Sequence, residues 1–415
     1  MKPRRTLIAS QEGLQKIQEA RVAIDKPLDD DWWTEKAAEI LNQGKAADDK
    51  NRESISTATW HRFYYARKPI RPSVFRAFCA VLELDPDDII DGTPVEGIGR
   101  PRQTYSGIQL IDQDTFIFGN IKTSWIVKDG TGEYTYEREN IVCHYESKAM
   151  AFPPDIEKSI AQVTLDQEQR RQKGEKPYFF NGNRYYFDRY TITRTAFEEK
   201  PVIDLWYGPS NYYTYLATNQ RLHEKKIRSK YFPKVLDQPI PFFSNAFAIY
   251  LCAITSDNYL VLTQRSQNVG SRPGEFNISA NEGLSRDLDH LGDRPDLFGC
   301  ALRGLKEELN VNQRNEKIKF LSFGVDALLG HWAVLGLTKT NETKADIELS
   351  RRGGVHDKWE NSGIAFVPFE LDLVIEYVLS VSPWAPAALA CIYHTLVFEF
   401  GRDNCDAAIK RITEQ

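Results

Sequence analysis

The sequence lacks the features that would assign it to several specialised classes of protein. Its six cysteines form no Cys-x-x-Cys pair, which argues against a zinc knuckle or a dense disulfide framework and fits a reducing compartment. A net charge of −5 argues against a chain that is basic throughout, so any contact with nucleic acid is expected to be local. No signal peptide and no bilayer-spanning run is recognisable. We therefore expect a soluble, cytoplasmic protein.

A length of 415 residues predicts several domains. Apolar residues recur at helical spacing over residues 12–23, 32–41 and 72–84, which predicts helices. The glycine- and proline-containing run 91–101 is typical of a linker. We therefore expect an all-α module over residues 1–98.

The next region, residues 99–239, is expected to be mostly β. Short β-branched and aromatic runs such as 115–118 and 141–145 predict strands, and Asn181-Gly182 predicts a hairpin turn. The charged stretch 167–176 is expected to be a loop or the end of a helix. No chemistry is assigned to this middle region from its sequence.

Residues 240–415 show the pattern of an α/β domain. Apolar runs at 246–254 and 259–263 predict a buried hairpin, and a helix is expected from about Leu297 to Leu309. Further strands are expected at residues 320–323, 332–335 and 364–369, and a closing helix is expected at residues 387–398. The expected order is β-β-loop-α-β-β-β-α.

The expected helix 297–309 carries paired carboxylates, Glu307 and Glu308, one turn after Arg303. An apolar stripe of Leu302, Leu305 and Leu309 fixes how the helix is rotated, and Asn310 suits a left-handed residue at its end. Adjacent carboxylates form a hard, oxygen-rich site, which suits Mg²⁺ or Mn²⁺ bridging diphosphate oxygens.

The segment Arg303-Gly304-Leu305-Lys306-Glu307-Glu308-Leu309-Asn310-Val311 resembles the second half of the Nudix box, G-x5-E-x7-R-E-U-x-E-E-x-G-U. The resemblance, which covers roughly residues 240–400, implies a Nudix fold and divalent-metal-dependent hydrolysis of a nucleoside diphosphate derivative such as ADP-ribose or an NAD-like compound. It implies that Glu307 and Glu308 bind the metal and that Arg303 orients them.

Three departures from the box bear on activity. Gly304 stands where the family has a glutamate, Asn310 replaces a glycine, and the spacing from residues 279–286 to Arg303 is too long. Glu360 is expected to supply the missing base or third metal ligand, and the other candidates are Glu282, Asp287 and Glu348. The alternative is an impaired Nudix domain that senses a nucleotide and controls a transcriptional regulator or a defence or signalling adaptor.

Further residues outside this helix are candidates for substrate binding. Arg265 and Arg286 bracket the Pro273-Gly274 loop and are expected to hold phosphates, and Phe276 or Trp332 is expected to stack on a base.

Residues 55–84 resemble the later helices of Cro/repressor-like helix-turn-helix domains. The resemblance places Ser56, Thr57, Thr59 and Arg62 against DNA bases and Arg67, Lys68 and Arg71 against phosphates. Residues 52–76 hold six arginines and lysines against one glutamate, which favours DNA. The long connection 41–54 departs from that layout. The module is also similar to adaptor domains that precede signalling ATPases in cyanobacteria, so DNA and protein partners both stay open. We also expect a homo-oligomer and no membrane association.

Overall fold

The computed structural model describes most of the chain. The chain divides into two compact units, residues 1–104 and 105–415. The described residues are 9, 11–24, 26–28, 30–42, 53–66, 70–89, 114–175, 178–195, 200–233, 235–267, 269, 271–314, 317–352 and 361–414. No helix within these ranges has both the length and the hydropathy that a membrane span requires.

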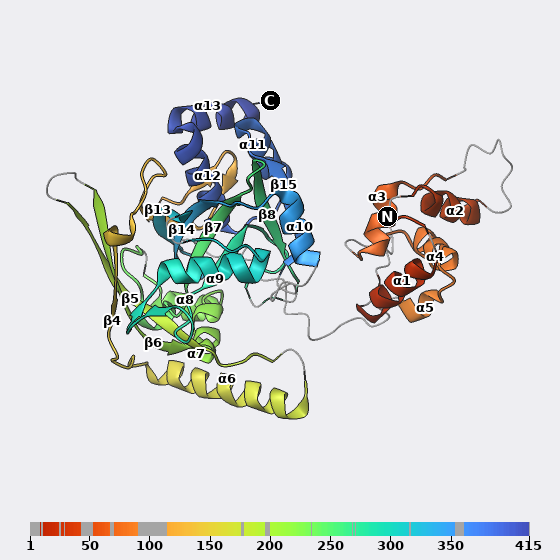
Figure 1. Cartoon of the computed structure of the whole chain (residues 1–415). Helices are drawn as coiled ribbons and strands as arrows, with labels where there is room; N and C mark the ends of the chain where they lie inside the picture. Colours follow the sequence, from red (N-terminus) through yellow and green to blue (C-terminus); the bar gives the residue numbers. More distant parts are fainter. Residues whose placement is uncertain are drawn as a thin grey trace. The chain divides into compact units, whose positions relative to one another are not determined.

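The first unit is helical, as expected (Figure 1). Its helices are α1 (Gln11–Ala23), α2 (Trp32–Leu41), α3 (Thr57–Tyr64), α4 (Pro72–Val81) and α5 (Pro86–Ile89). Trp33 and Trp60 stack at its centre, with ring centroids 4.7 Å apart. Their indole nitrogens donate to the carbonyls of Pro27 (2.7 Å) and Leu28 (2.9 Å), so the buried N–H groups are satisfied and the segment before α2 is anchored.

The second unit is built on a large mixed sheet of order β15-β8-β7-β14-β13-β3, to which β10 adds at β7 and β9 at β8. Its strands are β3 (Trp125–Asp129), β7 (Phe247–Ile254), β8 (Tyr259–Arg265), β9 (Phe276–Ile278), β10 (Ala280–Gly283), β13 (Lys319–Asp326), β14 (His331–Lys339) and β15 (Asn361–Pro368). The expected hairpin of β7 and β8 is confirmed. Parallel pairing of β14 with β7 joins the two halves of the sheet.

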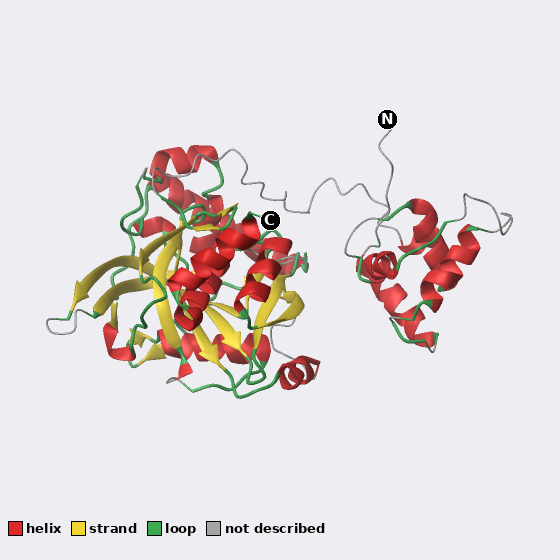
Figure 2. Ribbon diagram, turned by 90° about the horizontal axis from the view of Figure 1, so that it is seen from above, coloured by secondary structure: helices red, strands yellow, loops and turns green. Residues whose placement is uncertain are grey.

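Helices cover both faces of this sheet (Figure 2). Because successive strand residues point to opposite faces, Phe247, Ile249 and Leu251 of β7 pack with α9 (Leu297–Leu309). Tyr250 and Cys252 pack on the other face with α11 (Leu371–Ser380), α12 (Pro386–Phe400) and α13 (Arg402–Thr413).

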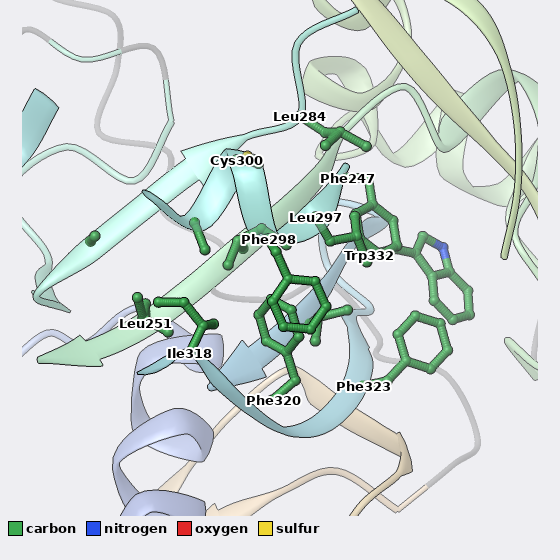
Figure 3. Packing of buried hydrophobic residues seen from close by; sticks show 14 of the residues in the cluster. Phe247, Leu251, Leu284, Leu297, Phe298, Cys300, Ile318, Phe320, Phe323 and Trp332 are labelled. Carbon is green, nitrogen blue, oxygen red and sulfur yellow. The ribbon is translucent and has the colours of Figure 1, made fainter. Parts of the chain in front are cut away.

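The bounds of α9 match the expected helix. Leu305 and Leu309 are fully buried and Leu302 is partly buried, so the expected apolar stripe does face the core. Phe298 of the same helix packs on Phe320 of β13, with ring centroids 4.8 Å apart (Figure 3). This packing fixes the rotation of α9 and therefore the direction of its polar side chains.

The expected middle region shares a core with the residues that follow it. A small sheet of order β4-β6-β5 contributes Phe187, Leu205 and Tyr207 to the cluster that contains Phe247 and Trp332. The main elements of this middle region are β4 (Ile141–Tyr145), α6 (Pro154–Lys173), β5 (Asn183–Arg194), β6 (Pro201–Asn211), α7 (Tyr212–Ala217) and α8 (Lys225–Tyr231). The described residues of 114–239 and those of 240–415 therefore belong to one folded unit.

One of two local expectations for this region is confirmed and the other was wrong. The charged stretch is the end of a helix, because residues 167–173 are the last turns of the 20-residue helix α6, which is capped by left-handed Gly174. Asn181-Gly182 precedes β5 and does not turn a hairpin, because the β5–β6 connection spans residues 195–200. The remaining short elements are β1 (Ile117–Phe118), β2 (Ile121–Lys122), β11 (His290–Leu291), β12 (Arg294–Pro295) and α10 (Lys344–Arg352).

Asn310 ends α9 in the left-handed conformation, with φ 57° and ψ 30°, as its sequence position predicts. Asn310→Val should lower the free energy of unfolding by about 1–2 kcal/mol, because a β-branched residue is strained at positive φ. Asn310→Gly should change it by no more than about 0.5 kcal/mol, since glycine adopts this conformation without strain. Chemical denaturation of both variants measures the difference. Equal effects of valine and glycine would contradict the assigned role.

Candidate functional site

Arg303 on α9 is the centre of a polar cluster that joins three segments of the chain. Its Nε and Nη2 donate to the two carboxylate oxygens of Asp289, at 2.8 and 2.7 Å. Its Nη1 lies 2.8 Å from Glu307 and 3.0 Å from Glu282 of β10. Nη2 also donates to the carbonyl of Gly283 at 3.0 Å. The guanidinium therefore holds α9 against β10 and against the loop before β11.

The cluster keeps Arg303 charged. Burial alone would lower its pKa, but the hydrogen bonds to Asp289 and the negative charge of Glu282 outweigh burial and raise the pKa of Arg303 well above its usual value. The Asp289 side chain is 1% exposed, so this bidentate pair is a buried one. Removing Arg303 would leave the buried charge of Asp289 without this cation, which is strongly destabilising, whereas removing Asp289 would still leave Arg303 paired with Glu282 and Glu307.

Glu308 lies on the buried side of α9 and is also engaged. One carboxylate oxygen accepts from the backbone N–H of Asn281 at 2.7 Å, and the other accepts from the Asn361 amide at 2.8 Å. Arg351 of α10 donates to the Glu308 carbonyl. Glu308 thus fastens α9 to β10 and β15, so its carboxylate has a structural role in the described chain.

Gly304 and Glu282 share one space. A Cβ built on Gly304 would lie 2.9 Å from the Cβ of Glu282, closer than real Cβ atoms approach other heavy atoms. The side-chain volume missing at residue 304 is therefore filled by Glu282 from the neighbouring strand. The Glu282 carboxylate points to Arg303, so an acidic group stands beside Gly304.

The described carboxylates that were expected to bind metal do not form a metal site in this structure. Among the described residues, no group of three or more His, Cys, Asp or Glu side chains is arranged to hold a metal ion. Glu282 and Glu307 contact Arg303, Glu308 accepts two amide hydrogen bonds, and Asp287 accepts from the Asn183 amide. Glu348 lies on α10, and Glu360 lies outside the described residues. The described carboxylates therefore do not fit Mg²⁺ or Mn²⁺ in this arrangement.

A pocket of about 320 Å³ adjoins the cluster and is lined in part by Asn281, Glu282 and Gly283. Three arginines lie in its wall: Arg184 of β5, Arg265 at the end of β8, and Arg272. Its aromatic and histidine lining comes from Phe179, Phe180, Tyr212, Tyr215, Phe247, Tyr250 and His331. The pocket thus joins residues of the small sheet to residues of the large one.

The three arginines differ in their charge partners. Arg272 is buried and pairs with Asp326 and, at 3.2 Å, with Glu275. Arg184 lies over the rings of Tyr212 (4.8 Å) and Tyr215 (5.8 Å), whereas the Nε of Arg265 donates to the Ser271 carbonyl at 3.0 Å. Within the described ranges, neither Arg184 nor Arg265 has a carboxylate at ion-pair distance. Among the described residues, the pocket therefore presents two guanidinium groups that form no ion pair, although the charge of Arg265 acts on the nearby Glu275 carboxyl group.

Only one of the expected substrate-binding residues lines this pocket. Arg265 does, but Phe276 packs on Trp384 with ring centroids 5.5 Å apart. Arg286 donates to the Asn183 side chain at 3.2 Å, and Trp332 is fully buried in the core. The sequence did not reveal Arg184 or Asp289, because Arg184 lies in the middle region and Asp289 in the stretch that lengthens the box.

Of the expected base-contacting residues, Ser56, Thr57 and Thr59 lie at the start of α3, whereas Arg62 lies in its last turn. Ser56 immediately precedes the helix and, like Arg62, is exposed. The Ser56 and Thr59 hydroxyls are 3.0 Å apart, and the Thr57 hydroxyl donates to Asp31 at 3.4 Å. Arg67 and Lys68 lie outside the described residues. Trp60 and Phe63 on the opposite side of α3 are buried, so one polar side of the helix faces outward.

Comparison with known proteins adds little to this geometry. No family model matches the chain. A stretch of 87 residues, 21% of the chain, is 36% identical to an uncharacterised WD repeat-containing protein of Nostoc sp. and covers 7% of that protein. The crystal structure of DR0079 from Deinococcus radiodurans aligns over 40% of this chain and 82% of its own, with a TM-score of 0.25 and 11% identity. Neither match carries an argument about function.

Gly304→Ala should lower the free energy of unfolding by about 1–3 kcal/mol, because the added methyl group overlaps Glu282. Glu282→Gly removes the Cβ that causes the overlap, so alanine at residue 304 should cost much less in that background. A double-mutant cycle by chemical denaturation measures this coupling. Additive effects would show that the two residues do not compete for one space.

Acid should destabilise the larger unit through His331 in the pocket wall, whose pKa burial lowers from 6.5 to about 4. Between these values the unfolded chain binds a proton that the folded chain does not, so stability falls as pH decreases, by up to about 1.4 kcal/mol per pH unit. His331→Gln should reduce this slope, measured by denaturation of the larger unit at pH 7, 6 and 5. Asp326, whose pKa is lowered from 3.8, acts only below this window. An unchanged slope would refute the assignment.

Proposed function

We propose that the larger unit binds a nucleoside diphosphate derivative, such as ADP-ribose or an NAD-like compound, in the pocket beside the Arg303 cluster. The observation that carries this proposal is the pair Arg184 and Arg265, two guanidinium groups without carboxylate partners in the described chain. Guanidinium groups bind phosphate oxygens through paired hydrogen bonds. The neighbouring tyrosine and phenylalanine rings suit a planar base.

The size of the pocket is consistent with a small molecule. A volume of about 320 Å³ lies near the lower end of the usual range for ligand pockets, roughly 300–1,000 Å³. The buried ring of Tyr250 adds apolar surface to the wall. Burial raises the pKa of Tyr250 to about 12, so its hydroxyl stays protonated and can donate a hydrogen bond. The wall therefore offers hydrogen-bond donors and positive charge, which suit an anionic ligand.

The role that we infer is sensing. The carboxylates of the acidic helix hold Arg303 and bind backbone and side-chain amides, which supports a binding domain better than a metal-dependent one. The helical unit would be the output element. It would contact DNA or a partner protein through the outward side of α3, where Ser56 and Arg62 are exposed.

Hydrolysis is the second candidate, and one observation favours it. Glu282 fills the space beside Gly304, so a carboxylate stands near the position at which the Nudix family carries the glutamate that this chain lacks. If Arg303 released its two glutamate partners, two acidic side chains would be available: Glu282, which lines the pocket, and Glu307 on α9. The two candidates differ in product formation, not in ligand binding.

A thermal-shift experiment on the full-length protein tests the binding proposal. ADP-ribose, NAD or a diadenosine polyphosphate should raise the melting temperature, because a ligand at 100 times its Kd adds about 2.7 kcal/mol of stability. Arg265→Gln should weaken this effect at least several-fold in apparent Kd, because it removes a phosphate donor. Arg411→Gln should not, since Arg411 pairs with Asp372 on the surface of α13 and α11.

The same samples, with and without Mg²⁺, distinguish the two candidates. A sensor should return the ligand intact. Magnesium-dependent release of a mononucleotide that Glu308→Gln abolishes would instead establish hydrolysis. Absence of any thermal shift with every ligand would refute the binding proposal. A gel shift of DNA by the full chain, with and without ligand, then tests the output element.

A further inference from the structure

The small sheet and the loop before it supply one wall of the pocket. Phe179, Phe180, Arg184, Tyr212 and Tyr215 all come from residues 179–215, whereas Arg265, Asn281 and Glu282 come from the large sheet and its additions. The sequence suggests no chemistry for residues 179–215. Their role in the pocket depends on the proposed function, which they make more specific.

Arg184 is held in place before any ligand binds. Its guanidinium lies 4.8 Å from the Tyr212 ring and 5.8 Å from the Tyr215 ring, contacts that limit its rotation and favour a cation. Its Nη1 lies only 2.8 Å from where a Cβ of Gly283 would stand. Glycine at residue 283 therefore leaves room for this guanidinium beside the Arg303 cluster.

Phe180 is an exposed ring on a fixed backbone. Its side chain is 82% exposed at the rim of the pocket. The surrounding loop is tied to α6 and α7, because Phe179 N donates to the Gln167 side chain and Tyr213 donates both to the Asn181 side chain and to the Phe179 carbonyl. A single exposed ring is ordinary on a protein surface; what singles out Phe180 is its place in the lining of the pocket, on an anchored loop.

We propose that residues 179–184 recognise the two chemically different ends of the ligand, with Arg184 binding a phosphate and Phe180 stacking on the base. Arg184 and Arg265 together match the two negative charges of a diphosphate. Glu282 also lines the pocket and contacts Arg303. Its carboxylate would repel a ligand that places a further negative charge beside it. The ligand class that fits is a nucleoside diphosphate whose base lies at the open rim.

Isothermal titration of the full-length protein with pyrophosphate and with ADP-ribose tests this assignment. Arg184→Met should weaken both ligands about tenfold or more, which corresponds to one charge-assisted contact, and Arg184→Lys should weaken them less. Gly283→Ala should act in the same direction, because the added methyl group would overlap the end of the Arg184 side chain and not the backbone. Phe180→Ala should weaken ADP-ribose several-fold and leave pyrophosphate unchanged.

Arg189→Met is the matched control. Arg189 lies on the same strand, half-exposed and over the Trp206 ring, but it does not line the pocket. Its replacement should leave both affinities within twofold of wild type. If the affinities of Arg184→Met for both ligands stay within twofold of wild type, or if the wild type does not bind pyrophosphate, the proposed role of Arg184 is wrong. Equal loss of both ligands in Phe180→Ala would overturn stacking.

Failure of this inference can be told from failure of the proposed function. If the wild type binds ADP-ribose and Arg265→Gln weakens it while Arg184→Met does not, the pocket is correct and the role of Arg184 is wrong. If the wild type binds pyrophosphate through Arg184 but no nucleoside diphosphate, the phosphate contact stands, and both the proposed function and the role of Phe180 fall.

Discussion

The buried bidentate pair of Arg303 and Asp289 is the interaction on which the site depends. It joins a helix to the loop that follows β10, and through Glu282, Gly283 and Glu307 it fixes the edge of the pocket. A buried ion pair is stabilising only if its remaining hydrogen-bonding groups are also satisfied. Here the guanidinium has a partner at each nitrogen, so the charge is tolerated and the geometry is rigid.

The contacts of these carboxylates limit metal binding. Carboxylates that are paired with an arginine or with backbone amides are less available to a divalent cation, because the cation must first displace those partners. The acidic helix of this chain therefore combines a sequence suggestive of metal chemistry with contacts that stabilise the fold. Gly304 belongs to the same arrangement, since a larger residue there would displace Glu282 from Arg303.

The helix and its ends could be predicted from the sequence because they depend on local patterns. Apolar spacing located α9, and the conformational preference of asparagine located its left-handed end at Asn310. The Arg303–Asp289 pair could not be predicted, because its members lie in segments whose approach is set by tertiary packing. Arg184 was missed for the same reason: its strand reads as ordinary β material, and only the fold brings it to Gly283.

The shared core also changes how the middle residues should be understood. Phe187 and Tyr207 of the small sheet pack with Phe247 and Trp332 of the large one, so the two sheets cannot separate without exposing a continuous apolar cluster. Well-packed interiors transmit small displacements because they are nearly incompressible. A ligand held by both Arg184 and Arg265 would bind only the folded arrangement of the two sheets. Its binding energy would therefore stabilise the whole larger unit, which is the physical requirement for a sensor that reports ligand through a change in stability or order.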